Sequence, residues 1–262
     1  MRIKILGSHG SDLFYSQNGK SHRCQCVGFL VNEHLLVDAG TVASALDFEA
    51  QTRIDHVILS HLHLDHIKGV PPLVDNRVGT NGTSICISSV AQVLDGLKTH
   101  IFNDIVFPNF FSLQNGHHPY LQESTLKEGT ETLLGDIRVT PIHVNHTVTT
   151  VGFLIQDDQS AWIYSGDTYQ TEELWALAAR TPNLKGALIE TSFPNEFEAL
   201  AKESKHLTPT LLAKEYQKIG KPELPLYVFH LKPQFREQIA SQLHDLALPS
   251  LCILQEGQEI EL

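Results

Sequence analysis

The pattern of hydrophobic and polar positions predicts strands that alternate with helices along the whole chain. Segment 1–7 places charged residues between apolar ones, which suits an edge strand with one face towards solvent. The run Val57-Ile58-Leu59 is apolar without interruption and indicates a buried strand. Strands are predicted over 2–6, 27–31, 34–37, 55–59, 84–88, 137–144, 151–156, 161–164, 186–190, 225–229 and 251–254.

Helices are predicted in the polar and periodic segments between these strands. Thr208-Pro209 is a helix start, because Thr can cap free N–H groups and Pro fits the first turn. Thr171 stands before two acidic residues that favour another first turn. This order predicts an α/β fold, an αββα sandwich of two mixed sheets with helices outside. The predicted helices are 66–73, 89–98, 171–180, 195–203, 208–219 and 233–246.

No linker, repeat or low-complexity run divides the 262 residues, so we expect a single domain over 1–262. A hydrophobic share of 42% is enough for a sizeable core. Segment 99–130 differs, because its aromatic residues follow no regular period. We expect a lid, a homodimer contact or a plain insertion there. Its aromatic residues are Phe102, Phe107, Phe110, Phe111 and Tyr120.

Composition narrows the classes of partner and compartment. The net charge of −11 disfavours long nucleic acids, which need clustered Lys and Arg, but it allows a small phosphorylated substrate. No apolar stretch approaches the ~20 residues that span a bilayer. The N-terminus lacks the apolar region of a secretion signal, so we expect a cytoplasmic protein. Cys24 and Cys26 lack the spacing of a structural zinc site, and we expect reduced thiols.

The motif His-Leu-His-Leu-Asp-His over 61–66 packs four side chains that can hold a metal into six positions. On an extended segment His61 and His63 point to the same side. Asp65 and His66 fall where the chain turns and can face the same cavity from another direction. Imidazole suits zinc and related ions, and one carboxylate among imidazoles favours a hydrolytic centre. The motif therefore predicts a metal site.

This motif and the elements around it resemble the metallo-β-lactamase fold superfamily. A strand that ends in Asp38-Ala39-Gly40 precedes the motif, and His146 follows a later strand. An apolar strand then leads to Gly166-Asp167, and a strand near the C-terminus ends at His230. These elements occur in the order that the superfamily shows, and they span nearly the whole chain. The motif alignment also selects His146 over His143, which lies inside the strand.

The resemblance implies two divalent metal ions that share a water or hydroxide and lower its pKa. Zinc is expected, while manganese and iron remain open because the His/Asp set accepts all three. Asp65 would also steer the nucleophile. Asp38 would either orient a ligand ring through a hydrogen bond or serve as a turn residue. The implied ligands are His61, His63 and His146 on one metal and Asp65, His66 and His230 on the other, with Asp167 bridging both.

The C-terminal third resembles the class II cyclic-nucleotide phosphodiesterases. Segments 190–195, 206–209 and 230–233 carry this likeness, which runs from about residue 26 to the end and departs from the pattern at Lys205 and around Val70-Pro71-Pro72. It implies hydrolysis of the 3'-ester bond of cAMP or cGMP to the 5'-nucleotide by a metal-bridged hydroxide. His206 precedes a helix N-terminus and would donate a proton to the ribose 3'-oxygen, unless it is only a packed residue.

Three other functions remain open on the sequence. An RNase Z-like tRNA 3'-processing nuclease shares the metal set, but Leu231-Lys232-Pro233 follows His230 where such enzymes carry an Arg-Tyr element. No Gly/Lys-rich arm for tRNA is visible. A glyoxalase-type thioesterase would use the same metals. A non-catalytic binding module is the last alternative, although such modules usually lose ligands.

Overall fold

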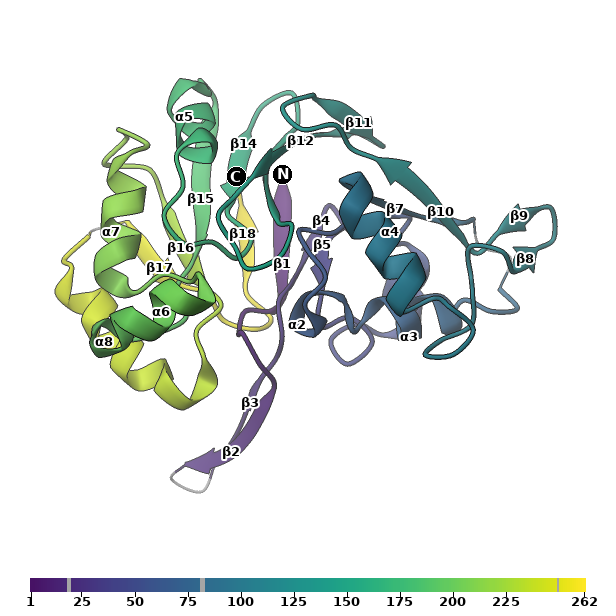
Figure 1. Cartoon of the computed structure of the whole chain (residues 1–262), viewed down its shortest axis with the longest axis horizontal. Coiled ribbons are helices and arrows are strands. Elements are labelled where there is room, and N and C mark those ends of the chain that lie inside the picture. The colour runs from purple at the N-terminus through teal and green to yellow at the C-terminus, as the bar shows by residue number, and fades with distance from the viewer. Residues whose placement is uncertain (18–19, 81–82, 249) are drawn as a thin grey trace.

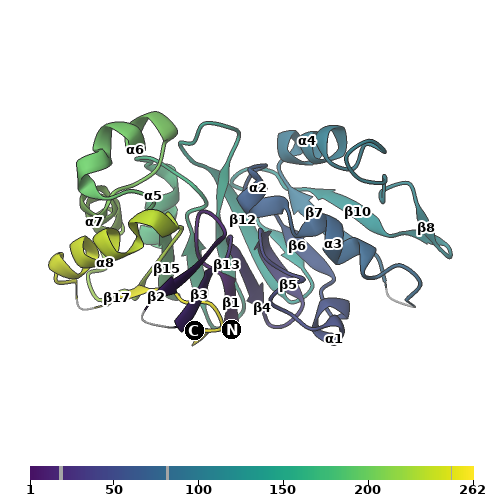
Figure 2. The same cartoon turned by 90° about the horizontal axis from the view of Figure 1, so that it is seen from below.

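Two seven-stranded sheets form the centre of the molecule in this computed structural model, which describes residues 1–17, 20–80, 83–248 and 250–262. Helices cover the outer face of each sheet (Figures 1 and 2). This arrangement confirms the predicted αββα sandwich. The buried side chains of the two sheets meet between them, where the ring of Tyr164 lies 5.7 Å from Phe29 and 5.2 Å from Phe229.

The first sheet has the strand order β10-β7-β6-β5-β4-β1-β18. β5, β6, β7 and β10 run parallel, so the carboxyl ends of β5 and β6 meet at one edge. β1 was predicted as an edge strand, which is wrong, because β18 pairs with it on its outer side. The strands are β1 (Arg2–Gly7), β4 (Gly28–Val31), β5 (Leu35–Ala39), β6 (His56–Ile58), β7 (Ile85–Ser89), β10 (Leu121–Thr125) and β18 (Glu259–Glu261).

The second sheet has the order β11-β12-β13-β14-β15-β16-β17. Its first four strands are antiparallel, and β14 to β17 are parallel. The carboxyl ends of β14, β15 and β16 therefore lie side by side. The strands are β11 (Thr132–Leu134), β12 (Ile137–His143), β13 (Val151–Gln156), β14 (Ala161–Tyr164), β15 (Leu184–Glu190), β16 (Leu226–Phe229) and β17 (Leu251–Ile253).

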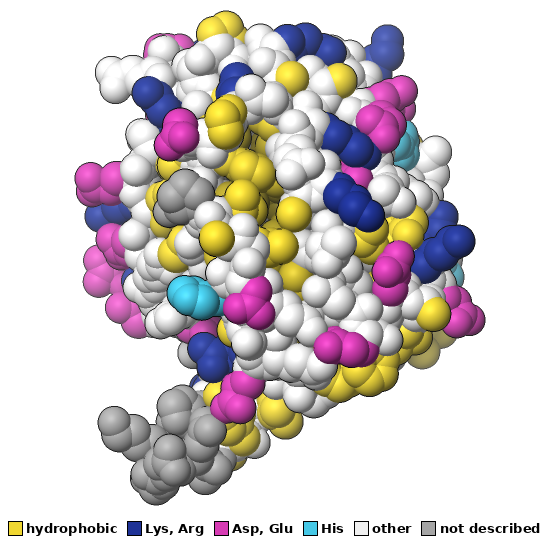
Figure 3. All heavy atoms as spheres, turned by 90° about the vertical axis from the view of Figure 1, so that its left-hand side faces the viewer, with side chains coloured by type: hydrophobic (Ala, Val, Ile, Leu, Met, Phe, Trp, Pro, Cys, Tyr) yellow, Lys and Arg dark blue, Asp and Glu magenta, His cyan; other side chains and the backbone are white. Residues whose placement is uncertain are grey.

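The helices fall into two groups, one on each sheet (Figure 2). None of those in the described part of the chain is long and apolar enough to cross a membrane. Figure 3 views the side where α7 and α8 lie, with apolar side chains at its centre. The first group is α1 (Phe48–Thr52), α2 (Leu64–Ile67), α3 (Val70–Asp75) and α4 (Ala91–His100). The second is α5 (Glu173–Arg180), α6 (Glu198–Ser204), α7 (Pro209–Gln217) and α8 (Arg236–Asp245), with 3-10 turns at Asn195–Phe197 and Pro233–Phe235.

Three helix predictions need correction. The predicted helix 66–73 is two short helices, because the Gly69 N–H donates a hydrogen bond to the carbonyl oxygen of Ala39 in β5 at 2.7 Å and not to a carbonyl of the helix. Helix α5 begins at Glu173 with Glu172 as its N-cap, so Thr171 does not cap it. Thr208 is the N-cap of α7 as predicted, but its side chain makes no capping hydrogen bond.

The sequence patterns also missed a β-hairpin that projects from the body of the molecule (Figure 1). It consists of β2 (Leu13–Gln17) and β3 (Lys20–Cys24). In segment 99–130, β8 (Gln114–Asn115) and β9 (His118–Pro119) form a small ribbon, and β10 joins the first sheet. Phe102 is buried there among other phenylalanine rings. The segment thus carries its own aromatic cluster; its role as a lid or dimer contact stays a prediction.

Candidate metal centre

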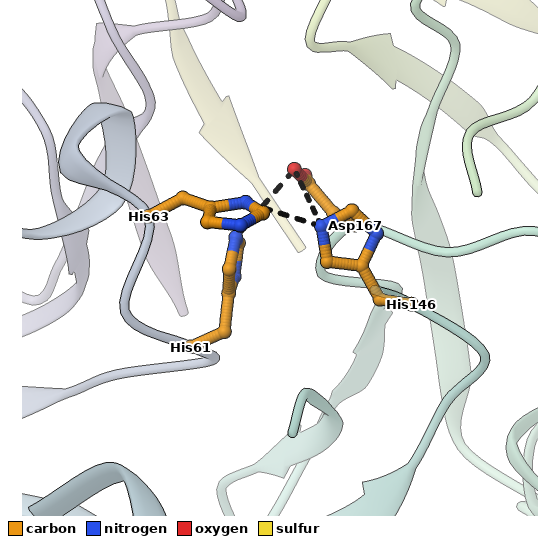
Figure 4. A group of neighbouring side chains, drawn as sticks. All are labelled: His61, His63, His146 and Asp167. Carbon is orange, nitrogen blue, oxygen red and sulfur yellow. Dashed lines mark hydrogen bonds and ion pairs between the residues drawn. The ribbon is translucent and has the colours of Figure 1, made fainter. Parts of the chain in front are cut away.

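Four side chains from three different loops converge at the edge where the strands of both sheets end (Figure 4). His61 and His63 follow β6, His146 follows β12, and Asp167 follows β14. Their ligand atoms all lie within 4.8 Å of one another. His146 Nε2 is 3.2 Å from His63 Nδ1, and Asp167 Oδ2 is 3.7 Å from His61 Nε2. Parallel strands make this convergence, because their carboxyl ends share one edge.

A second group of ligand atoms adjoins the first. Asp65, His66 and His230 also offer atoms within 4.8 Å of one another, and Asp65 Oδ2 lies 3.2 Å from His230 Nε2. Asp167 lies between the groups, since its Oδ1 is 3.2 Å from His66 Nε2 and its Oδ2 is 3.2 Å from His230 Nε2. The structure thus brings together every side chain that the sequence proposed as a ligand.

The residues of this centre fit bound cations. His61 Nε2, His66 Nε2 and Asp167 Oδ1 are buried and have no hydrogen-bond partner. A buried polar atom without a partner costs about 1–3 kcal/mol, so a folded protein rarely keeps several together unless an ion satisfies them. Imidazole nitrogen and carboxylate oxygen are suitable ligands for zinc, manganese and iron.

Burial and neighbouring charges set the proton states of the centre. Burial lowers the pKa of His61 well below its usual range, and it lowers that of His146 to about 4. Both rings are therefore neutral and keep a lone pair for a metal. Burial alone would raise the pKa of Asp167, but His230 and His66 hold it well below its usual range. The carboxylate is therefore ionised, as a bridging ligand must be.

Asp38 holds the first side of the centre. It is fully buried at the end of β5, and its Oδ2 lies 2.7 Å from His66 Nδ1. The same oxygen accepts hydrogen bonds from Ser60 Oγ at 2.6 Å and from the Tyr164 hydroxyl at 2.5 Å. Ser60 Oγ is also 2.9 Å from His61 Nδ1. One carboxylate thus orients His66 directly and His61 through Ser60; nothing in the sequence pattern identified Ser60 or Tyr164 as its partners.

A buried carboxylate, Glu190, holds the other side, and sequence reasoning assigned it no role. Glu190 Oε1 lies 2.7 Å from His206 Nδ1. Burial, and to a smaller extent the negative charge of the nearby Asp167, raises the pKa of Glu190 to about 8. Ser192 Oγ lies 2.7 Å from His230 Nδ1 and 3.2 Å from His206 Nδ1. The available signal was a polar run, Glu190-Thr191-Ser192, directly after an apolar strand.

His206 lies against the cluster. It is only 7% exposed, and its ring centre is 5.1 Å from that of His146 and 5.2 Å from that of His230. Asp167, His206 and His230 also offer atoms within 4.8 Å of one another. His206 Nδ1 faces Glu190, so its Nε2 is the atom left for a substrate.

Several other sequence candidates lie outside this cluster. His143 is exposed and is 3.6 Å from Glu128, so it does not compete with His146. Lys232 Nζ donates a hydrogen bond to the carbonyl oxygen of Gly10 at 2.8 Å. Cys24 and Cys26 are free and buried. His9, in the loop after β1, is only 4% exposed, and its Nδ1 is 2.7 Å from Glu256 Oε1, so it is not a solvated loop residue.

Comparisons with known proteins agree with this geometry. Three solved structures share the fold over nearly all of both chains. Unliganded yeast PDE1 matches with a TM-score of 0.83 and 19% identity, over 100% of this chain and 99% of that one. YhfI from Bacillus subtilis matches with a TM-score of 0.74 and 20% identity over 99% of both chains, and the short form of human tRNase Z, ELAC1, with a TM-score of 0.70 and 15% identity over 100% of this chain and 99% of that one. No curated protein sequence matches the chain. A model of the β-lactamase superfamily domain matches residues 34–230, so the chain belongs to this superfamily of metal-dependent hydrolases.

Proposed function

We propose that this protein is a dinuclear metal-dependent phosphodiesterase. His61, His63 and His146 would hold one divalent ion, and Asp65, His66 and His230 the other. Asp167 would bridge them. The observation that carries this proposal is the position of Asp167, whose two oxygens face both groups of ligands within 4 Å. Zinc is the proposed metal, with manganese and iron as the alternatives.

Two divalent ions bound there would lower the pKa of a water molecule and neutralise charge on a phosphoryl oxygen. The chain itself supplies what the ions do not. Asp65 is partly exposed at the mouth of the centre. Burial alone would raise its pKa, but His230 and His66 lower it by more, so the carboxylate stays ionised. It can therefore accept a hydrogen bond from the attacking water and orient it.

His206 is the proposed proton donor to the leaving oxygen. Its Nδ1 points to Glu190, so the outward Nε2 can carry a proton towards a departing alkoxide. Glu190 is buried and fixes the ring from behind, which makes it a positioning residue. Because the pKa of Glu190 is raised and that of His206 is lowered by burial, the pair shares one proton near neutral pH.

The proposed substrate is a 3',5'-cyclic nucleotide, cAMP or cGMP. Support comes from the segments that resemble class II cyclic-nucleotide phosphodiesterases and from the fold shared with yeast PDE1. The fold shared with tRNase Z keeps tRNA 3'-processing as a second candidate. The net charge of −11 favours the small substrate, because binding a long polyanion needs clustered cations.

The test is hydrolysis of cAMP by purified protein, with product analysis and metal determination on the same sample. Release of 5'-AMP, abolished by Asp65→Ala and by a chelator, is the expected result. Two bound metals without turnover of cAMP, cGMP or any other diester would contradict the proposal. A cytoplasmic location and a homodimer stay predictions from the sequence; sedimentation analysis of the purified protein tests the dimer.

A further inference from the structure

Two adjoining cavities lie between the β2–β3 hairpin and the start of α8. The smaller has a volume of about 170 Å³ and is lined by His9, Arg23, Arg236 and Glu256, among others. The larger has about 490 Å³ and is lined by Leu13, Pro233, Arg236 and Glu237, among others. Tyr15 and Arg236 line both, so the two spaces share a wall. Figure 2 shows the hairpin beside α8.

These cavities lie next to the proposed metal centre because the same two segments build both. The backbone of His9 forms an isolated parallel β-bridge with that of Leu231, the residue after His230. Gly10 lies so close to His230 that a Cβ there would be 2.5 Å from its ring. Pro233, three residues after His230, lines the larger cavity. A ligand that fills these spaces would therefore lie near the segment that carries His230.

The charges of the smaller cavity favour an anion. The negative charge of Glu256 is balanced by the positive charge of His9 beside it. Burial alone would lower the pKa of His9, but contacts with Cys24 and Glu256 raise it to about 9. Arg23 and Arg236 are then the charged residues of the smaller cavity whose charge is not balanced there. The ion pairs that arginines make in the described part of the chain involve Arg2, Arg53 and Arg138, and neither Arg23 nor Arg236 is among them. Two unmatched arginines in one cavity are unusual in a chain of net charge −11.

Size and shape narrow the anion. A water molecule occupies about 30 Å³ in the liquid, so the smaller cavity has room for a phosphate group but not for a nucleoside. Guanidinium groups match phosphate oxygens in pairs of parallel hydrogen bonds. The larger cavity lies in the size range of small-molecule sites, and Leu13, Tyr15 and Pro233 give it apolar surface for a ring.

We propose that Arg23 and Arg236 bind a phosphate group of the substrate other than the one that is cleaved, with its attached organic group in the larger cavity. The inference rests on the proposed phosphodiesterase function and narrows its substrate class. Beyond cyclic mononucleotides, the enzyme should prefer phosphodiesters that carry a second phosphate.

A matched pair of substrates tests this. One is the p-nitrophenyl ester of thymidine 5'-phosphate, and the other is the same ester with a 3'-phosphate. We expect the native enzyme to show a kcat/KM roughly tenfold or more higher for the second ester, the difference that one or two charge-assisted hydrogen bonds produce. Arg23→Gln and Arg236→Gln should each bring the ratio towards one. The matched control is Arg180→Gln at the end of α5, which should keep the native ratio.

A native ratio near one, or a ratio that survives in both variants, would overturn the inference. Folding and metal content of each variant are checked by circular dichroism and metal analysis. If neither ester is hydrolysed, the proposed function fails, and calorimetry then decides the inference alone. Thymidine 3',5'-bisphosphate should bind more tightly than thymidine 5'-phosphate, by a factor that Arg236→Gln removes; equal affinities would refute the site.

Discussion

Glu190 shows how a single buried residue can decide the chemistry of its neighbour. It is fully buried at the end of β15, and its carboxylate contacts His206, Ser192 and the backbone N–H of Thr168. Burying a carboxyl group costs free energy unless hydrogen bonds compensate for the lost solvation. Here the hydrogen bonds also have a function, because they hold His206 against the metal ligands with its Nε2 facing outward. Sequence patterns assigned a role to His206 but not to Glu190, because a polar run at a strand end does not show which side chain its Glu will contact.

Replacing His206 tests the proposed proton transfer. We expect His206→Ala to lower kcat by roughly 10²–10⁴-fold, the usual contribution of a general acid, while two metals stay bound. Glu190→Gln should lower kcat less and shift the alkaline limb of the pH profile, because it changes the proton affinity of the ring that donates the proton. The control is His143→Ala, which alters an exposed His outside the centre. Metal loss in His206→Ala would show that the role is structural.

The pair His9–Glu256 predicts a pH dependence of stability. The folded state raises the pKa of His9 from 6.5 to about 9. The pair therefore stabilises the fold fully below about pH 6.5, and this contribution is lost as the pH rises through 9. We expect the native protein to lose on the order of 3 kcal/mol more unfolding free energy than His9→Gln between pH 6.5 and 9.5. Parallel losses in both proteins, measured by urea unfolding, would contradict this.

At the scale of elements, the strands that carry the site residues could be predicted, whereas the β2–β3 hairpin and the strands β10 and β18 could not. Apolar runs gave β5, β6, β14 and β16, and the motif at 61–66 gave the polar residues beyond β6. The β2–β3 hairpin was missed because its sequence is mostly polar, and its apolar residues Leu13 and Phe14 are exposed. β10 and β18 were missed for a related reason: each gains its order by pairing with a distant strand, a contact that local periodicity does not report.

Gly10 connects the hairpin segment to the metal centre. A Cβ at this position would lie 2.5 Å from His230 Cε1 and 2.7 Å from Nδ1. Gly10→Ala should therefore displace the His230 ring, and we expect the bound metal to fall from two ions towards one, with a matching loss of turnover. Metal analysis after dialysis measures this. Ser11→Ala, at the exposed neighbouring position, is the control; two ions retained by Gly10→Ala would contradict this prediction, because the His230 ring would then have kept its place.

At the scale of the whole molecule, the proposed centre links the two layers of the sandwich. His61, His63, Asp65 and His66 come from the first sheet and its loops, and His146, Asp167 and His230 from the second. The order of these residues along the chain let the sequence predict the set. It could not show that Asp38, on the first sheet, also bonds Tyr164 on the second, because no periodicity specifies contacts between layers.

A centre that joins two layers should stabilise the fold when it is filled. Unpartnered His61 Nε2, His66 Nε2 and Asp167 Oδ1 would gain ligand bonds only in the folded state. Free zinc at a thousand times its dissociation constant would add about 4 kcal/mol. For a chain of this size that raises Tm by roughly 8–16 °C over the chelated protein, measured by differential scanning calorimetry. Asp167→Asn should lose most of the rise, whereas Asp136→Asn, a change at the exposed turn between β11 and β12, should keep it. Equal Tm values with zinc and with chelator would mean that these seven side chains do not form a metal centre, and the hydrolytic mechanism would fall with it.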